Sequence, residues 1–149
     1  MKVAVANDHG GYTLKGALLA QLEKEGVEII DFGVNDTNSV DYPDYALMVA
    51  ECVASGKADK GILICGTGIG ICIAANKVKG IRCAHCADAY SAKMTREHND
   101  ANIIAFGGRT IGPEIMHDIV YNFLHTEFAG GRHANRVGKI SQIEEKYFK

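Results

Sequence analysis

Short apolar runs alternate along the chain with segments in which apolar residues recur at helical spacing. The runs, each closed by Gly or by polar residues, predict strands at residues 3–6, 27–30, 62–64, 81–86 and 102–105. Apolar residues three or four positions apart predict helices at about residues 14–25, 46–53, 71–75, 89–97, 115–124 and 134–147. This alternation of strand and helix is typical of a parallel sheet with helices on both faces.

We therefore expect a single α/β domain over residues 1–149, a Rossmann-like three-layer α/β/α sandwich around a five-stranded parallel sheet. A content of 47% hydrophobic residues is enough for one sizeable core. The longest expected loop covers residues 31–43 and carries Tyr42. The helix at 134–147 is an extra C-terminal element with no strand after it. Its apolar side is expected to be used in dimerisation and consists of Val137, Ile140, Ile143 and Tyr147.

The stretch most informative for function is KGILICGTGIGICIAAN at residues 60–76. Glycines at positions 66, 68 and 70 follow a strand and enter a helix, where bare main-chain N–H groups can bind negative charge. Cys65 stands at the edge of this turn. A buried cysteine is most often a small core residue. A thiol at a helix N terminus, however, has a stabilised thiolate that can act as a base or nucleophile.

A nucleotide could occupy the same turn without any chemistry. The spacing of the glycines is G-x-G-x-G, which does not match the G-x-G-x-x-G of dinucleotide sites, although Asp88 lies near the distance expected for a ribose contact. No G-K-[ST] follows, which excludes a P-loop. The nucleotide interpretation is therefore the weaker one.

Further polar residues stand at the ends of predicted strands and helices. Each has a plain structural interpretation: Asp8 as a helix cap, His98 as a partner of a helix dipole, and the two arginines of the last helix as solvated side chains. The alternative is that they bind a phosphorylated ligand, because guanidinium groups four residues apart share one side of a helix. The strand ends at 7–9, 65–67 and 108–109 should lie along one edge of the sheet. The candidates are Asp8, His9, His98, Asn99, Arg109, Arg132 and Arg136.

Composition excludes several classes of protein. Sixteen basic and 18 acidic residues give a net charge of −2, without the basic excess of a nucleic-acid-binding domain. No apolar run is long enough to span a membrane, and the N-terminal residues lack a signal-peptide pattern, so we expect a cytoplasmic protein. Five cysteines spread through apolar segments indicate reduced thiols. Cys83 and Cys86, three apart in a strand, should point to opposite faces, which argues against a metal site.

Six short motifs together resemble those of a known family. They are NDHGG at 7–11, DYPDYA at 41–46, CGTGIG at 65–70, HNDAN at 98–102, GGR at 107–109 and RHANR at 132–136. In this order they resemble the ribose-5-phosphate isomerase B / galactose-6-phosphate isomerase family of sugar-phosphate isomerases, over nearly the whole chain. With Cys65 in the turn, the chain looks like the branch that uses a thiol as its base.

The resemblance implies interconversion of D-ribose 5-phosphate and D-ribulose 5-phosphate through a cis-enediolate, in the pentose phosphate pathway, without a metal or an organic cofactor. Cys65 would be the base that moves a proton between C2 and C1, and His98 the acid that opens the sugar ring. Thr67 and Asp8 would hydrogen-bond the sugar during catalysis. The implied substrate-binding residues are Asp8, His9, Tyr42, Gly66, Thr67, Gly68, Ile69, Gly70, Asn99, Arg109, Arg132 and Arg136.

In the family the active site lies between two subunits, with His98 and Asn99 coming from the partner chain. We therefore expect a homodimer, or a dimer of dimers, and a small sugar phosphate as the other partner, with no nucleic acid or membrane. Two alternatives stay open. The substrate could be a six-carbon sugar phosphate such as allose 6-phosphate or galactose 6-phosphate, or the chain could be a non-catalytic nucleotide-binding module.

Overall fold

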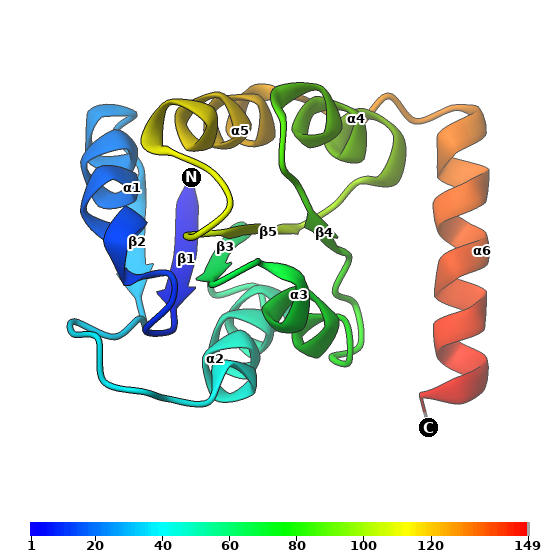
Figure 1. Cartoon of the computed structure of the whole chain (residues 1–149). Coiled ribbons are helices and arrows are strands. Elements are labelled where there is room, and N and C mark those ends of the chain that lie inside the picture. The colour runs from blue at the N-terminus through cyan, green and yellow to red at the C-terminus, as the bar shows by residue number, and fades with distance from the viewer. Residues whose placement is uncertain (149) are drawn as a thin grey trace.

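The structure is a computed structural model that describes residues 1–148. Lys149, the last residue of the predicted domain, lies outside the described residues. Within them the sheet has five strands, all parallel, in the order β2-β1-β3-β5-β4 (Figure 1). The elements are β1 (Lys2–Asn7), α1 (Tyr12–Lys24), β2 (Glu28–Asp31), α2 (Tyr42–Ala54), β3 (Lys60–Cys65), α3 (Ile69–Ala75), β4 (Cys83–His85), α4 (Ala89–Asn99), β5 (Ile103–Gly107), α5 (Pro113–His125) and α6 (Arg132–Tyr147).

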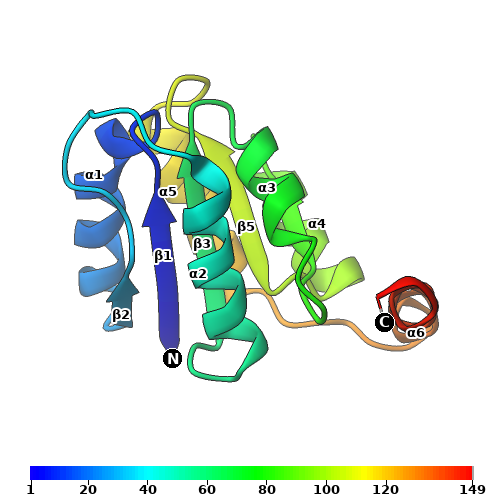
Figure 2. The same ribbon diagram turned by 90° about the horizontal axis from the view of Figure 1, so that it is seen from below.

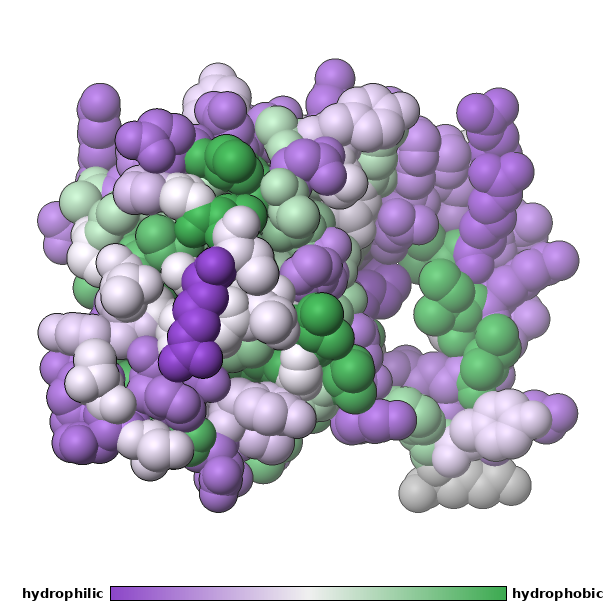
Figure 3. Space-filling view, viewed as in Figure 1, coloured by the Kyte–Doolittle hydropathy of each residue, from purple (hydrophilic) through white to green (hydrophobic). Residues whose placement is uncertain are grey.

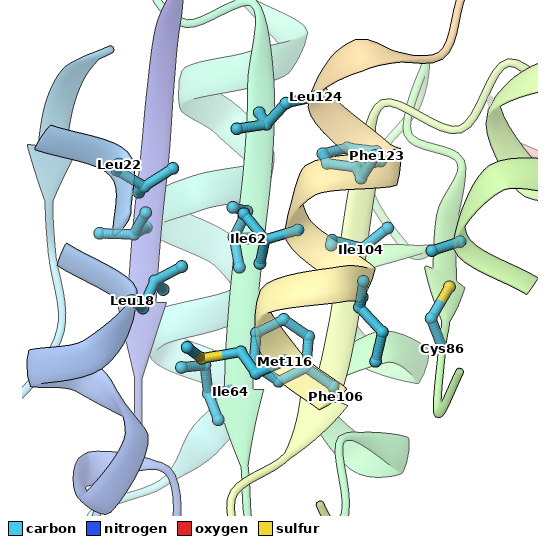
Figure 4. Packing of buried hydrophobic residues seen from close by; sticks show 14 of the residues in the cluster. Leu18, Leu22, Ile62, Ile64, Cys86, Ile104, Phe106, Met116, Phe123 and Leu124 are labelled. Atoms are coloured by element: carbon cyan, nitrogen blue, oxygen red, sulfur yellow. The ribbon is translucent and has the colours of Figure 1, made fainter. Parts of the chain in front are cut away.

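Two layers of helices cover the sheet because side chains alternate between its faces. In β3, Ile62 and Ile64 pack with residues of α1, α4 and α5, whereas Leu63 and Cys65 pack with residues of α2 and α3. Figure 4 shows the first of these clusters between the sheet and its helices. The prediction of a three-layer α/β/α sandwich with a five-stranded parallel sheet is confirmed.

The cysteines behave as the sequence indicates. All five lie in the described part of the chain and are free thiols. Cys83 packs with the α2 and α3 face and Cys86 with the opposite face, as their spacing predicts. Burial, and secondarily the charge of Asp88, raise the pKa of Cys86 to about 12, so this thiol is unreactive at neutral pH.

Several element boundaries differ from the predictions. Tyr42 begins α2 and does not lie in a loop, because Pro43 is well suited to the first turn of a helix and Asp41 takes the N-cap position. The helix α3 begins at Ile69, two residues earlier than expected, and α6 begins at Arg132 directly after two glycines of positive φ, Gly130 and Gly131. The fourth strand is shorter than predicted.

The last helix stands apart from the three layers. Figure 2 shows α6 beyond α4, away from the edge to which the strand arrowheads point. It contributes no buried residue, and Ile140 and Ile143 are exposed. In Figure 3, hydrophobic atoms lie on the side of α6 that faces the rest of the chain. A hollow of about 440 Å³ separates this side from β4 and α4. Its role in dimerisation stays a prediction.

Candidate active site

Three loops meet at the carboxyl edge of the sheet. The N–H of Asp8 donates to the carbonyl of Ile64 (3.1 Å), and the N–H of Gly108 donates to the carbonyl of Cys65 (2.8 Å). The N–H of Arg109 continues this ladder to the carbonyl of Gly66 (3.0 Å). Main-chain hydrogen bonds thus hold the ends of β1, β3 and β5 side by side. This is the arrangement expected for the binding crevice of an open α/β sheet.

The buried thiol of Cys65 is part of the glycine turn. Its Sγ accepts a hydrogen bond from the N–H of Gly68 at 3.0 Å. Gly68 has φ +80°, and a Cβ there would lie 2.5 Å from the carbonyl carbon of Phe106, so both conformation and space require glycine. The N–H of Ile69 donates to Oγ1 of Thr67 at 3.3 Å. Two of the amides expected to face a ligand therefore already have partners within the turn.

Asp8 and His9 are fixed by backbone groups on either side of the turn. Oδ1 of the buried Asp8 accepts the N–H groups of Gly10 (2.8 Å) and Gly11 (3.1 Å), so this carboxylate shapes the loop that enters α1. The Nδ1 atom of His9 accepts the N–H of Val40 at 3.2 Å. Since Nδ1 is an acceptor, the neutral imidazole carries its proton on Nε2, where it can donate to a ligand.

Tyr42 and Arg109 lie against the glycines of the turn. A Cβ on Gly70 would lie 2.7 Å from Cζ of Tyr42, and one on Gly66 would lie 3.4 Å from Nη1 of Arg109. The loop before Tyr42 is held by the buried Lys15, which donates to the carbonyls of Gly33 and Val34 and pairs with Asp31 at 2.9 Å. We call the set at this edge the turn cluster; it comprises Asp8, His9, Tyr42, residues 65–70 and Arg109.

A second group of candidates gathers where α4 ends and α6 begins. The rings of His98 and His133 stack with centroids 4.2 Å apart and planes 7° from parallel. Partial desolvation, and then the positive charges of His98, Arg132 and Arg136, lower the pKa of His133. This region is therefore electropositive and suits an anion. We call this set the helix cluster; it comprises His98, Asn99, Arg132, His133 and Arg136.

Charged residues fix the end of α4 that carries the helix cluster. Asp100 ends the helix in a left-handed conformation, and its carboxylate pairs with Arg96 (2.9 Å) and Arg82 (3.1 Å). The buried Arg96 also donates to the carbonyls of Ala101 and Thr126, and the N–H of Ala129 donates to the carbonyl of Glu97. The segment before α6 is thus bound to α4, which brings the start of α6 beside His98.

The two clusters lie at opposite edges of the sheet. Cys65 is paired in register with Gly107, the last residue of β5, whereas Asn99 is only four residues before Ile103, the first. At about 3.3 Å per residue, the two ends of β5 are about 13 Å apart. One copy of the chain therefore does not bring His98, Arg132 and Arg136 to the thiol of Cys65.

Two histidines of these regions were missed from the sequence. His133 lies inside the RHANR motif, where only the arginines drew attention. His85 ends β4 and its Nε2 lies 2.9 Å from the carbonyl oxygen of Thr67. No periodicity or spacing marks His85 as part of the turn, because the contact depends on β5 pairing with both β3 and β4.

Within residues 1–148, no three His, Cys, Asp or Glu side chains are grouped so that they could hold a metal ion. In the same part of the chain, every helix is too short or too polar to cross a membrane.

Comparison with known proteins identifies relatives over nearly the whole length. Residues 3–140 match the family model described as Ribose/Galactose Isomerase. Ribose-5-phosphate isomerase B of Escherichia coli is 49% identical, over 97% of each chain. The solved structure of ribose-5-phosphate isomerase B from Clostridium thermocellum is 58% identical and superposes with a TM-score of 0.97, covering 99% of each chain.

A third relative was solved with a bound sugar. It is ribose-5-phosphate isomerase B from Mycoplasma genitalium with bound ribulose-5-phosphate, which is 39% identical with a TM-score of 0.92, over 97% of this chain and 96% of that one. The family model covers far more than half of the chain, and the relatives are named as isomerases of sugar phosphates. The chain therefore belongs to the ribose/galactose isomerase family and is a sugar-phosphate isomerase.

Proposed function

We propose that the protein interconverts D-ribose 5-phosphate and D-ribulose 5-phosphate at a site shared between two copies of the chain. The observation that carries the proposal is the division of the candidate residues. A base stands in the turn cluster, whereas the ring-opening acid and two phosphate-binding arginines stand in the helix cluster, at the other edge of the same sheet. Pairing two copies related by a two-fold axis would complete two equivalent sites.

The thiol is suited to the proton transfer. As a thiolate, Cys65 removes the hydrogen on C2 of the open-chain aldose, and the electron pair of that C–H bond becomes part of a cis-enediolate. The proton on O2 passes to O1, and the same sulfur returns its proton to C1, which yields the ketose with its carbonyl at C2. The hydrogen bond from Gly68 to Sγ supports this role because it stabilises the negative charge on sulfur.

The charge of the enediolate needs donors that are already in place. The turn from Gly66 to Gly70 offers main-chain N–H groups, apart from those of Gly68 and Ile69, which already donate to Cys65 and Thr67. Preorganised donors at a developing oxyanion commonly contribute several kcal/mol. Asp8 and Thr67 would hold the sugar hydroxyls beside them.

The acid and the phosphate site would come from the helix cluster of the partner copy. His98 is the acid that protonates the ring oxygen as its bond to C1 breaks, and the C1 hydroxyl loses its proton to become the aldehyde. Asn99 binds a hydroxyl. Arg132 and Arg136, one turn apart on α6, bind the phosphate together with His9 and Arg109 of the first copy. The exposed apolar side of α6 and the hollow beside it support pairing through this region.

A panel of phosphorylated sugars tests the function. We expect kcat/KM to be highest for ribose 5-phosphate, and lower for allose 6-phosphate and galactose 6-phosphate, because several relatives are named ribose-5-phosphate isomerase B and one of them binds ribulose-5-phosphate. A higher kcat/KM for a six-carbon sugar would assign the substrate to the hexose phosphates. Absence of turnover with every sugar phosphate in the panel would overturn the proposal.

A further inference from the structure

The peptide between Thr67 and Gly68 has both of its polar groups engaged. Its N–H donates to Sγ of Cys65 at 3.0 Å, and its carbonyl oxygen lies 2.9 Å from Nε2 of His85. In a trans peptide the C=O and N–H point in opposite directions. A contact that holds the carbonyl on one side therefore directs the N–H to the other side, where the sulfur lies.

The contact fixes the tautomer of His85. A carbonyl oxygen can only accept, so Nε2 of His85 must carry a proton and donate. The donor is present in the neutral Nε2–H tautomer and in the imidazolium form alike. His85 thus supplies a hydrogen bond to the turn whatever its charge.

An external contact can favour one orientation of this peptide. Glycine reaches positive and negative φ about equally well, so the peptide before Gly68 has little intrinsic preference for the orientation that aims its N–H at Cys65. His85 lies close enough to favour one orientation of the peptide, since its Cδ2 would be 2.9 Å from a Cβ on Gly68. The residue is exposed and ends the edge strand β4, opposite Ala105, so the core does not depend on it.

We propose that His85 is a positioning residue of the isomerase site, which holds the Thr67–Gly68 peptide so that its N–H stabilises the thiolate of Cys65. The hydrogen bonds run in one direction, from His85 to the carbonyl of Thr67 and from the N–H of Gly68 to the sulfur. Bonds in such a chain polarise and strengthen one another. The catalytic part of this proposal rests on the isomerase function proposed above, whereas its effect on the thiol does not.

Two variants distinguish the loss of the hydrogen bond from the loss of side-chain packing. His85→Val suits an edge strand but removes the donor, whereas His85→Gln keeps a neutral N–H at a similar reach. Each is compared with the wild-type protein in kcat and KM for ribose 5-phosphate. The alkylation rate of Cys65 by iodoacetamide at pH 7 is followed on the Cys65 peptide by mass spectrometry. Circular dichroism checks that both variants fold.

We expect His85→Val to lower kcat and the alkylation rate of Cys65 by about tenfold each, with KM changed less than about twofold, and His85→Gln to stay within about threefold of wild type. Wild-type values for His85→Val would overturn the proposal, as would an equal loss in His85→Gln. A fall in kcat without a fall in alkylation would also overturn it. If the wild-type protein isomerises no sugar phosphate, the proposed function fails, and the alkylation rates still decide the role of His85.

A measurement on the unaltered protein covers the case in which a variant does not fold. The ring ¹⁵N resonances of His85 at pH 8 report which nitrogen carries the proton. We expect the Nε2-protonated tautomer. The Nδ1-protonated tautomer would overturn the proposal, because Nε2 could then not donate to Thr67.

Discussion

The turn cluster and the helix cluster differ in how the chain supports them. The first lies where three central strands end, and backbone hydrogen bonds from Asp8, Gly108 and Arg109 hold its loops together. The second lies at the junction of α4 and α6, and α6 has no buried residue of its own. The first is thus built into the core of one copy, whereas the second is anchored mainly at the end of α4.

This difference suggests a division of tasks. Proton transfer at carbon needs a base and donors that are held in place to within a fraction of an ångström, which a rigid sheet edge provides. Binding a phosphate needs mainly positive charge, which two arginines on an exposed helix provide. If the division is right, damage to the turn cluster should lower kcat, and damage to the arginines of the helix cluster should mainly raise KM.

The largest effect is expected from Cys65→Ala. Removing a general base typically costs about 10²–10⁴-fold in rate, and the loss should appear in kcat because the alanine leaves the phosphate contacts intact. Rapid-quench kinetics measures turnover, and calorimetry measures binding of ribose 5-phosphate. Near-normal turnover would remove Cys65 from the mechanism. Cys52→Ala is the matched control, since Cys52 is also buried but lies on α2 away from the turn.

Mixing two inactive variants tests whether the clusters of two copies form one site. Cys65→Ala and His98→Asn should each be inactive alone, because each lacks one of the two proton-transfer groups. After subunits are exchanged, roughly half of the dimers are mixed and each has one intact site of two, so about a quarter of wild-type activity should return. Native mass spectrometry verifies that mixed dimers form. Mixed dimers without any activity would contradict a shared site.

A smaller effect is expected at the arginines of the helix cluster. Arg132→Gln and Arg136→Gln should each raise KM by about tenfold while kcat changes less, because a hydrogen bond to a charged group is worth about 1.5–3 kcal/mol. Steady-state kinetics with ribose 5-phosphate measures both constants. Lys146→Gln removes the same charge at the other end of α6 and serves as control. An unchanged KM in both arginine variants would refute the phosphate assignment.

The same assignment has a spectroscopic consequence. The positive charges around His133 lower its pKa, after a first contribution from desolvation. An anion bound between the arginines offsets these charges, so inorganic phosphate should raise the pKa of His133, as followed by NMR of the ring. No change at saturating phosphate would place the anion elsewhere.

The sequence predicted the fold well because the fold follows from local patterns. Alternating residues such as Ile62 and Leu63 predict two covered faces of a strand, and glycines predict the turns between elements. The sequence failed where one residue decides a boundary. With Pro43 in its first turn, α2 begins at Tyr42, four residues before its apolar spacing begins at position 46, so Tyr42 was assigned to a loop.

The candidate site was predictable in part. The sequence allowed the prediction that the strand ends at Asp8, Cys65 and Arg109 lie close together, because parallel strands all end at one edge of the sheet. The contact of His85 with Thr67 could not be predicted, because neither residue is near the other in sequence and the order of β3, β5 and β4 in the sheet had to be known. The pairing of His98 with His133 was hidden for the same reason, since it depends on how the segment before α6 binds α4.

The smallest effect concerns Lys60, which starts β3 at the amino edge of the sheet, opposite the turn cluster. Its Nζ donates to the carbonyls of Phe123 and Leu124 at the end of α5. Burial, and then the charge of Arg96, lower its pKa from 10.5 to about 8. If Lys60 itself serves stability and not chemistry, Lys60→Met should alter the pH dependence of stability and leave kcat unchanged.

The sign of that dependence follows from proton binding. Below pH 8 the amine is charged in the folded and the unfolded chain, so the cost of burying the charge is fully present. Between about 8 and 10.5 the folded protein loses this proton first, so the unfolded chain binds more protons and the free energy of unfolding rises with pH. Urea unfolding from pH 7 to 10 should therefore show wild type gaining stability relative to Lys60→Met. If the stability of wild type and of Lys60→Met changed equally with pH, the lowered pKa of Lys60 would be contradicted. Lys57→Met is the control: because Lys57 is exposed, the stability of this variant should change with pH as that of wild type does.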